Sequence, residues 1–264
     1  MSTQLNPAVS VILPILNEER DLQECISAIL KQDYAGDLEI ILALGPSTDN
    51  TNQIAKSLAQ SDSRIKLVEN PTGKTAAALN LAIAAASNEI ICRIDGHAEI
   101  SNSYIKTAVE IMNRTGAVNV GGLMQADAKH GFQSVVATAM RSKIGVGASK
   151  FHTGGEAGPA DTVYLGTFKK SAILQAGGFD EKYIRAQDWE LNHRLRLNGG
   201  VIWFDPRLVV TYRPRDTFSK LAKQYFEYGR WRRAVSREHK GTVNYRYLAP
   251  PMALVINLLS LLTG

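Results

Sequence analysis

Short apolar runs alternate with amphipathic stretches through the first hundred residues. Four runs have the length and β-branched content of buried strands: Val9–Leu13, Leu38–Leu44, Arg64–Val68 and Glu89–Ile94. Helical spacing or helix-start residues occupy the intervals at 18–32, 47–60 and 74–86. This alternation predicts an α/β fold whose parallel strands are joined by right-handed crossovers. Pro14 is expected to stop the first strand.

The second half of the chain is less regular. Val118–Leu123 predicts another strand, and residues 142–160 are rich in Gly, Ser and Thr. Such composition favours a mobile loop. No internal repeat and no clear linker is visible in the sequence.

Composition narrows the class of protein. The chain has 264 residues, of which 45% are hydrophobic and 21% charged, which is typical of a globular protein with one large α/β domain or two small ones. Cys25 falls in a helical pattern and Cys92 in an apolar strand, so both are expected in the core. Two separate core cysteines favour a protein of a reducing compartment, and they are too few to predict a zinc site.

The positive charge is concentrated near the end of the chain. Residues 211–247 hold ten Lys and Arg against three acidic residues, within a total net charge of +5. We therefore predict a main domain at 1–210 and a basic amphipathic, membrane-proximal segment at 211–248. A solvated helix face is the alternative. Nucleic acid is not expected as a partner, because no recognised binding motif accompanies the charge.

The last segment, residues 249–264, reads APPMALVINLLSLLTG and carries no charge. A membrane-spanning helix needs about 20 apolar residues, and this run has 16. It fits the start of a spanning helix, an interfacial segment or a core helix. No secretory signal peptide is apparent at the N-terminus.

The fourth strand runs directly into Asp95-Gly96-His97. Ligands bind at the carboxyl edge of open α/β sheets, and residues separated by one position point the same way in extended backbone. Asp95 and His97 could thus hold a divalent cation that bridges to a diphosphate. Gly96 would let the backbone approach a bulky anionic ligand. The alternative is a turn in which Asp95 caps the next segment.

A series of motifs resembles the family 2 glycosyltransferases. The order is ValSerValIleLeuPro at 9–14 with AsnGlu at 17–18, SerThrAspAsnThr at 47–51, GlyLys at 73–74, AspGlyHis at 95–97, GlyGlyPheAsp at 177–180, GlnAspTrpGluLeu at 187–191 and the stretch 224–231. The likeness extends over about residues 9–233. The branch that it most resembles contains membrane-associated enzymes of bacterial exopolysaccharide assembly, including the succinoglycan type.

This resemblance implies a GT-A fold, a Rossmann-like, mostly parallel sheet flanked by helices. It also implies inverting transfer of a sugar from a nucleotide-diphosphate donor to an acceptor hydroxyl. Such a reaction needs a cation for the departing diphosphate and a general base for the acceptor proton. The expected cofactor is Mn²⁺ or Mg²⁺, and the expected acceptor is a lipid-linked sugar or a growing polysaccharide.

The resemblance assigns the metal to Asp95 and His97. Asp95 matches the first carboxylate of the family's Asp-x-Asp motif, and His97 stands where the second usually is. Imidazole is softer than carboxylate, which favours manganese. The alternative role for His97 is a hydrogen bond to the donor phosphate.

Asp188 matches the catalytic base of the family. A helical pattern follows it, so Asp188 is expected near a helix N-terminus, where the dipole favours the charged carboxylate. Burial beside Trp189, a predicted acceptor contact, would raise its pKa. Glu190 is expected to point elsewhere on the helix. A helix cap is the alternative role for Asp188.

The nucleotide site departs most from the family. After the second strand, residues 43–46 read Ala-Leu-Gly-Pro, where the family usually has aspartates. Asp49 more plausibly serves the helix start. Pro14 and Glu18 keep the family's loop after the first strand. Glu18 could reach the ribose or base, and Lys74 the base or diphosphate. The alternative for Lys74 is a solvated lysine at a helix start.

Arg230 and Trp231 resemble a looser version of the family's Gln-x-x-Arg-Trp element. Guanidinium binds phosphate in a bidentate manner, so Arg230 could pair with the leaving diphosphate. Trp231 could form a wall of the acceptor site. The alternative is amphipathic packing on a membrane-facing helix.

The sequence thus predicts a metal-dependent glycosyltransferase at the cytoplasmic face of the cell membrane, with loop 142–160 closing over the donor. The alternative is a non-catalytic module of the same fold that binds a sugar nucleotide or a membrane, favoured by the missing aspartates. Nucleotidyl transfer is disfavoured, because Leu16-Asn17-Glu18-Glu19 is acidic where a basic phosphate loop would be needed.

Overall fold

The computed structural model describes residues 6–128, 131–142 and 149–242, together with 252–253, 255–257 and 259–260. Part of the predicted loop at 142–160, part of the basic segment 211–248 and most of the apolar tail 249–264 therefore lie outside the described residues. No described helix is both long enough and apolar enough to cross a membrane.

The first half of the chain forms the parallel part of the sheet, as predicted. Its strands lie in the order β3-β2-β1-β4, and every neighbouring pair is parallel. Its elements are β1 (Val9–Ile15), α1 (Leu22–Leu30), β2 (Leu38–Leu44), α2 (Thr51–Ser61), β3 (Ile65–Glu69), α3 (Thr75–Ala85) and β4 (Ile90–Arg93).

The second half extends the same sheet to nine described strands, in the order β3-β2-β1-β4-β8-β6-β9-β5, with β7 beside β9. Here β6 and β9 are parallel, whereas β8 runs antiparallel to both β4 and β6. Its elements are β5 (Glu99–Ile100), α4 (Tyr104–Thr115), β6 (Asn119–Ala126), α5 (Gly131–Met140), α7 (Lys150–Thr153), β7 (Gly158–Pro159), β8 (Tyr164–Lys169), α8 (Lys170–Gln175), α9 (Gln187–Leu197), β9 (Ile202–Tyr212) and α10 (Phe218–Glu238).

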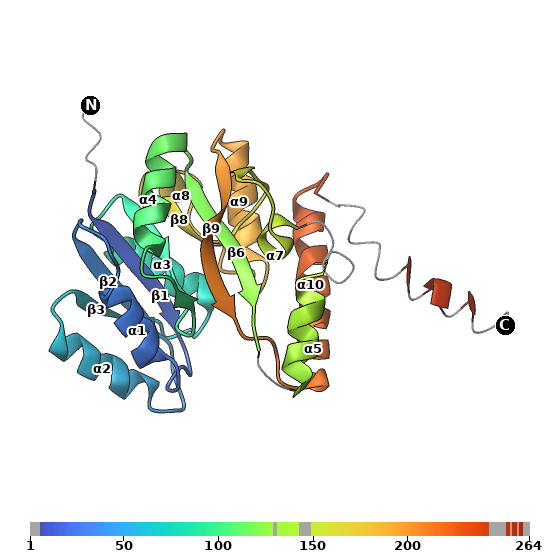
Figure 1. The fold of residues 1–264 in the computed structure, drawn as a ribbon, viewed down its shortest axis with the longest axis horizontal. Helices are drawn as coiled ribbons and strands as arrows, with labels where there is room; N and C mark the ends of the chain where they lie inside the picture. The colour runs from blue at the N-terminus through green and yellow to red at the C-terminus, as the bar shows by residue number, and fades with distance from the viewer. Residues whose placement is uncertain are drawn as a thin grey trace.

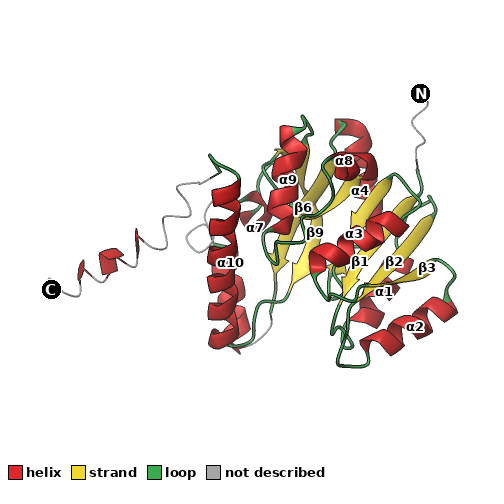
Figure 2. Cartoon of the chain, turned by 180° about the vertical axis from the view of Figure 1, so that it is seen from behind, coloured by secondary structure: helices red, strands yellow, loops and turns green. Residues whose placement is uncertain are grey.

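Helices cover both faces of the sheet (Figures 1 and 2). The apolar residues of α1 and α4 pack with one set of alternate residues of β1, including Val11 and Leu13. Those of α3 and α9 pack with Ile12 on the opposite face. This two-sided burial explains why the central strands are almost continuously apolar. Cys25 and Cys92 are both buried, as predicted.

Pro14 does not stop the first strand, contrary to the prediction. β1 continues to Ile15, and Pro14 lies opposite Ala43 of β2. The pairing of β1 with β4 ends at Ile12, whose carbonyl accepts from Ile94. Pro14 is two residues further on, so its missing N–H falls on the side where the ladder has already ended.

Two predicted segments can be compared with the observed elements. β9 continues to Tyr212, so the predicted domain boundary at residue 210 falls inside a strand. The described part of loop 142–160 contains α7 and β7, because Phe151 packs against the apolar cores of the sheet. Within the predicted basic segment 211–248, Phe218–Glu238 form α10, which lies at the end of the sheet beside α5 (Figure 1).

Candidate functional site

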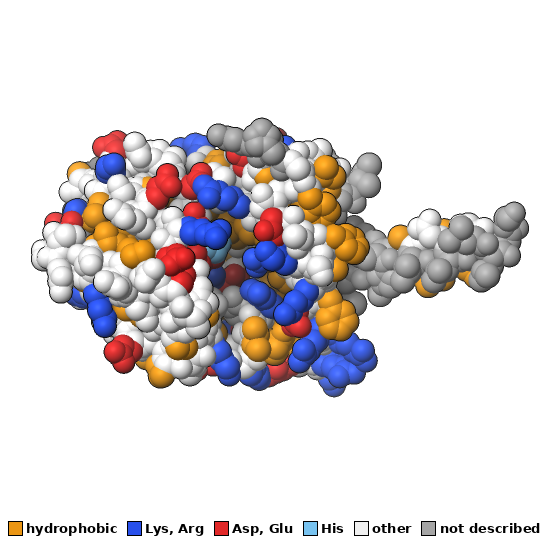
Figure 3. All heavy atoms as spheres, turned by 90° about the horizontal axis from the view of Figure 1, so that it is seen from below, with side chains coloured by type: hydrophobic (Ala, Val, Ile, Leu, Met, Phe, Trp, Pro, Cys, Tyr) orange, Lys and Arg blue, Asp and Glu red, His pale blue; other side chains and the backbone are white. Residues whose placement is uncertain are grey.

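The predicted donor residues gather where the parallel strands end. Glu18 follows β1, Asp95 follows β4, and Lys74 lies exposed immediately before α3. Seen from below, this side of the molecule is hollowed, with His and acidic side chains in the hollow and Lys and Arg side chains around it (Figure 3). The fold thus places these candidates at the sheet edge where α/β proteins bind ligands.

Arg93 joins the predicted metal ligand Asp95 and the predicted base Asp188. It is the last residue of β4 and only 3% exposed. Its Nε and Nη2 donate to Asp95 Oδ1 at 3.2 and 3.1 Å, and its Nη1 donates to Asp188 Oδ1. Asp95 and Asp188 are thereby brought to one guanidinium from the two halves of the chain. Sequence analysis missed Arg93, although a charged residue inside an apolar strand is a signal that a partner is required.

Asp188 lies in the first turn of α9, as predicted. Burial raises the pKa of its carboxyl above the ordinary value, Arg93 opposes that rise, and Asp95 adds to it. Burial also raises the pKa of Tyr164, at the start of β8, and the charge of Asp95 raises it further. The site therefore contains a carboxylate whose proton affinity is increased, as a general base requires.

Among the described residues, the hydrogen bond of the His97 side chain goes to Glu18 and not to Asp95. Its Nδ1 lies 2.8 Å from Glu18 Oε1, and this hydrogen bond raises the pKa of the imidazole. Glu18, in the loop after β1, is thus paired with His97, in the loop after β4. The pair fixes the orientation of both side chains at the donor edge.

Gly96 also has a packing role, while its predicted role toward a ligand stays a prediction. A Cβ at this position would lie 2.8 Å from Ile15 Cδ1 and 3.0 Å from Glu18 Cγ. The loop after β4 therefore packs so closely on the end of β1 and the loop after it that the side chains of Ile15 and Glu18 would have to shift to admit a Cβ. Glycine is needed for contact between two parts of the protein, whether or not a ligand is bound.

A divalent cation fits this edge only if the bound sugar nucleotide supplies some of its ligands. Among the described residues, no group of three or more His, Cys, Asp and Glu side chains is arranged to hold a metal ion. Arg93 donates its hydrogen bonds to Oδ1 of Asp95, and Glu18 bonds to Nδ1 of His97. Asp95 Oδ2 and His97 Nε2 are therefore the two atoms left to coordinate a cation. Magnesium-type sites are often completed by substrate phosphates in this way.

The loop between β2 and α2, which lacks the aspartates usual in the family, is stabilised by local hydrogen bonds. Asp49 Oδ1 accepts from the Thr51 N–H at 3.1 Å and from its hydroxyl at 2.5 Å, at the start of α2, as expected for a helix-start residue. The Glu18 N–H donates to Thr51 Oγ1 at 2.7 Å. Residues 43–46 contribute no carboxylate to the donor edge.

Trp189 packs between helices. Its ring stacks on His193 with centroids 5.3 Å apart, and the guanidinium of Arg232 lies 5.0 Å from its centroid. Its side chain therefore contacts α10, and its role toward the acceptor stays a prediction.

The contacts of Arg230 and Trp231 are with α10 and the loop before α9. Arg230 is exposed and lies 3.7 Å from Glu227, while Trp231 donates to Glu227 at 3.2 Å and packs edge-on against Tyr183. Arg230 also lines a depression on the outer face of α10, together with Tyr225, Phe226, Gly229, Arg233, Ala234 and Arg237. The structure does not bring these two residues onto Asp95 or Asp188 through any described contact.

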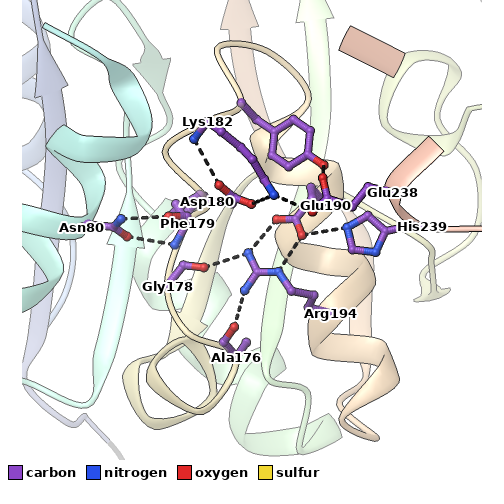
Figure 4. A network of polar contacts seen from close by, with 11 residues as sticks. Asn80, Ala176, Gly178, Phe179, Asp180, Lys182, Glu190, Arg194, Glu238 and His239 are labelled. Carbon is purple, nitrogen blue, oxygen red and sulfur yellow. Dashed lines mark hydrogen bonds and ion pairs between the residues drawn. The ribbon is translucent and has the colours of Figure 1, made fainter. Parts of the chain in front are cut away.

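Glu190 belongs to a network of polar contacts that holds α9, the helix that carries Asp188 (Figure 4). Arg194 donates to both carboxylate oxygens of Glu190 at 2.6 Å, and His239 lies 3.1 Å from one of them. Arg194 also donates to the Ala176 carbonyl and, at 2.8 Å, to that of Gly178. This network fixes α9 against the preceding loop and the end of α10, and sequence reasoning assigned it no role.

With this geometry in place, comparison with known proteins decides the family. Residues 10–172 match the family described as Glycosyl transferase family 2. The chain belongs to this glycosyltransferase family. It is 32% identical over 242 residues to the succinoglycan biosynthesis protein ExoA of Rhizobium meliloti, across 91% of this chain and 73% of that protein.

A second relative comes from Methanococcus voltae. This dolichyl N-acetyl-alpha-D-glucosaminyl phosphate 3-beta-D-2,3-diacetamido-2,3-dideoxy-beta-D-glucuronosyltransferase is 28% identical, across 97% of this chain and 82% of that protein. The family assignment covers Asp95 and Arg93, whereas Asp188 follows the matched region.

Solved structures show that the fold is of the GT-A type. A Pyrobaculum calidifontis mannosyltransferase, PcManGT, in complex with GDP-Man and Mn²⁺, has a TM-score of 0.70 at 21% identity, covering 92% of this chain and 67% of that one. TarS 1–349 of S. aureus in complex with UDP has a TM-score of 0.62 at 16% identity, covering 90% and 67%. The glycosyltransferase fold predicted from sequence is confirmed.

Proposed function

We propose that this family 2 glycosyltransferase moves a sugar from a nucleoside-diphosphate donor to an acceptor hydroxyl with inversion. The observation that carries the proposal is the meeting of Asp95 and Asp188 on Arg93 at the carboxyl edge of the sheet. One carboxylate faces the donor and the other serves the acceptor. Structural relatives bound to UDP and to GDP-Man support a nucleotide-sugar donor.

Asp188 is the proposed general base. It takes the proton of the acceptor hydroxyl as the acceptor oxygen forms its bond to the anomeric carbon and the bond to the diphosphate oxygen breaks. A single displacement of this kind inverts the anomeric configuration. The raised pKa of Asp188 increases its ability to hold the proton, and its place in the first turn of α9 stabilises the ionised form.

The residues of the donor edge fit a divalent cation. Asp95 and His97 would hold Mn²⁺ or Mg²⁺, and a cation there supplies charge neutralisation for the departing diphosphate. The Mn²⁺ complex of the mannosyltransferase supports the use of a divalent cation. Lys74 and Glu18 are proposed to contact the nucleotide, beside the loop that Pro14 leads into.

The first experiment is calorimetric titration of UDP- and GDP-sugars, with Mn²⁺ and then with EDTA. We expect one nucleotide class to bind in a metal-dependent way. Asp188→Asn should keep that donor affinity and lose transfer by about 100-fold or more, because only proton removal is affected. Asp95→Ala is the matched variant and should lose the metal-dependent binding. Normal turnover of Asp188→Asn would remove the base assignment.

A lipid-linked or polysaccharide acceptor at the cytoplasmic face of the cell membrane is the proposed second substrate. Support comes from the basic helix α10, whose exposed face combines arginines with Tyr225 and Phe226. Cations and aromatic rings on one helix face suit an anionic interface. Trp189, Trp231 and Arg230 are the residues of this region proposed to contact the acceptor or the leaving diphosphate.

A non-catalytic binding module is the second candidate. It is favoured by residues 43–46, which bring no carboxylate to the nucleotide edge. Donor binding that is unaffected by Asp188→Asn, together with the absence of transfer in the wild-type protein, would support it.

A further inference from the structure

Asp95 and Asp188 are 93 residues apart in sequence and lie on separate elements. The backbone alone places one after β4 and the other at the start of α9. The contact that joins them is the guanidinium of Arg93, which uses Nε and Nη2 toward Asp95 and Nη1 toward Asp188. One planar, rigid group thus fixes the two carboxylates relative to each other.

Arg93 is itself held firmly. β4 lies between β1 and β8, and Arg93 pairs with Ile12 on one side and Gly166 on the other. Its side chain is 4% exposed, whereas those of Asp95 and Asp188 are 22% and 33% exposed. The guanidinium therefore lies beneath two carboxylates that still reach solvent. A buried cation of this kind can orient both without blocking access to them.

We propose that Arg93 is a positioning residue that sets the separation of Asp95 and Asp188 and lowers the net negative charge of the donor edge. The assignment of roles to the two carboxylates rests on the proposed function. Both bonds to Asp95 end on Oδ1, so Oδ2 stays available for the donor side within the described structure. A cation at that edge shares Asp95 with the guanidinium.

The first test separates positioning from simple packing. Arg93→Lys keeps the charge but loses the fork that reaches both carboxylates. We expect kcat to fall on the order of 100-fold with the donor KM changed less than threefold, because small misplacement of reacting groups is costly while the donor contacts remain. An unchanged kcat in folded Arg93→Lys would overturn the proposal. Arg64→Lys is the matched control, since Arg64 forms an exposed fork with Asp62.

The second test measures Mn²⁺ binding directly, by electron paramagnetic resonance of the free ion, with UDP or GDP present at saturation to supply the phosphate ligands that the described residues do not complete. Arg93→Met removes a positive charge beside Asp95, so we expect Mn²⁺ to bind about tenfold more tightly, even as turnover is lost. A merely structural residue would leave the affinity unchanged or weaken it. Unchanged or weaker binding in a folded variant would overturn the charge-sharing part of the proposal.

A third measurement stays informative if the wild-type protein shows no transfer or no Mn²⁺ binding, which would count against the proposed function. Thermal melting of Arg93→Met, Asp188→Asn and the double variant forms a cycle. We expect strongly non-additive shifts in melting temperature, because Arg93 and Asp188 are joined by a direct hydrogen bond that either single variant removes. Additive shifts would show that Arg93 and Asp188 are independent, and the proposal would fail on structural grounds alone.

Discussion

Glu39 lies at the start of β2, at the end of the sheet opposite Asp95 and Asp188. Its carboxylate accepts from the Ser87 N–H at 2.6 Å, from Lys66 Nζ at 2.7 Å and from the Ser10 hydroxyl. Burial raises its pKa, but the bonds from Lys66, Ser10 and Ser87 prevail and lower it from 4.5 to about 2. A buried carboxylate with this many donors stabilises the sheet as an anion.

We expect Glu39→Gln to destabilise the protein by about 2–3 kcal/mol near neutral pH. Because the folded-state pKa is lowered, this stabilisation is present above the ordinary pKa and is lost as pH falls toward 2. Urea unfolding at pH 7, 4 and 3 would show the wild-type protein approaching the variant as pH falls. Glu69→Gln, at the exposed end of β3, is the control. A constant difference across pH would contradict the ionic role.

The raised pKa of Asp188 predicts where the rate of transfer falls at acidic pH. The base must be ionised, so kcat/KM should fall as pH drops through a value above 3.8, the ordinary value for this carboxyl. The measurement is transfer rate against pH with a saturating acceptor. An acid limb that stays at or below 3.8 would mean that burial of Asp188 is offset by Arg93.

Gly96 is a position where one methyl group should matter. Gly96→Ala brings a Cβ within 3.0 Å of Ile15 and Glu18, and overpacking of this kind costs about 1–3 kcal/mol. Gly229→Ala is the matched control, because a Cβ there meets nothing within 4 Å and the residue lies inside α10. That control should gain about 0.5–1 kcal/mol. Urea unfolding of both variants checks the prediction, and a stabilised Gly96→Ala would contradict it.

At the scale of elements, α9 carries the proposed base but depends on its neighbours for its position. Glu190 binds Arg194 within α9 and His239 just after α10, and Arg194 binds the carbonyl of Gly178 in the loop before the helix. Lys182 and Tyr183 of the same loop bond Glu238 (Figure 4). The end of α10 is therefore coupled to the helix that presents Asp188.

Glu190→Gln should destabilise the protein by about 3–5 kcal/mol, because it leaves the charge of Arg194 partly buried without its partner. Glu181→Gln, an exposed carboxylate that accepts from Asn80, should cost less than about 1 kcal/mol. Chemical denaturation measures both. Equal effects in the two variants would show that the buried pair does not hold the helices together.

At the scale of the whole molecule, α10 divides into two faces. Trp231 and Val235 lie toward the domain, where Trp231 contacts Tyr183 and Val235 is buried. Phe226 and Arg233 lie on the outer face and are exposed. The outer face is thus the part of the helix that is available to an anionic surface.

Replacement of Lys223, Arg233 and Arg237 by Glu should abolish binding to vesicles containing phosphatidylglycerol. Each basic residue near such a surface contributes about 1 kcal/mol, and the attraction weakens with salt. Replacement of Lys31, Lys56 and Arg64 by Glu gives the same change in net charge away from α10. Flotation with neutral and anionic vesicles measures binding. Equal loss in both triple variants would assign the effect to net charge, not to this helix.

Local patterns in the sequence determined much of the fold and part of the site. Alternating apolar runs and helix-start residues predicted β2 at its observed bounds, because burial on both faces of a parallel sheet requires a continuous apolar run. The motifs placed Asp95 at the end of a strand and Asp188 at the start of a helix, and both positions are confirmed.

Only the tertiary structure decided which side chains meet. The pairing of His97 with Glu18, and of His239 with Glu190, joins residues 79 and 49 positions apart. Arg93 looked like an ordinary strand residue until the fold brought Asp188 to it. Local sequence sets backbone conformation through propensity and periodicity, whereas the identity of a distant partner follows from how strands and helices pack. A charged residue in a buried apolar strand requires a partner, and the fold alone determines which residue that partner is.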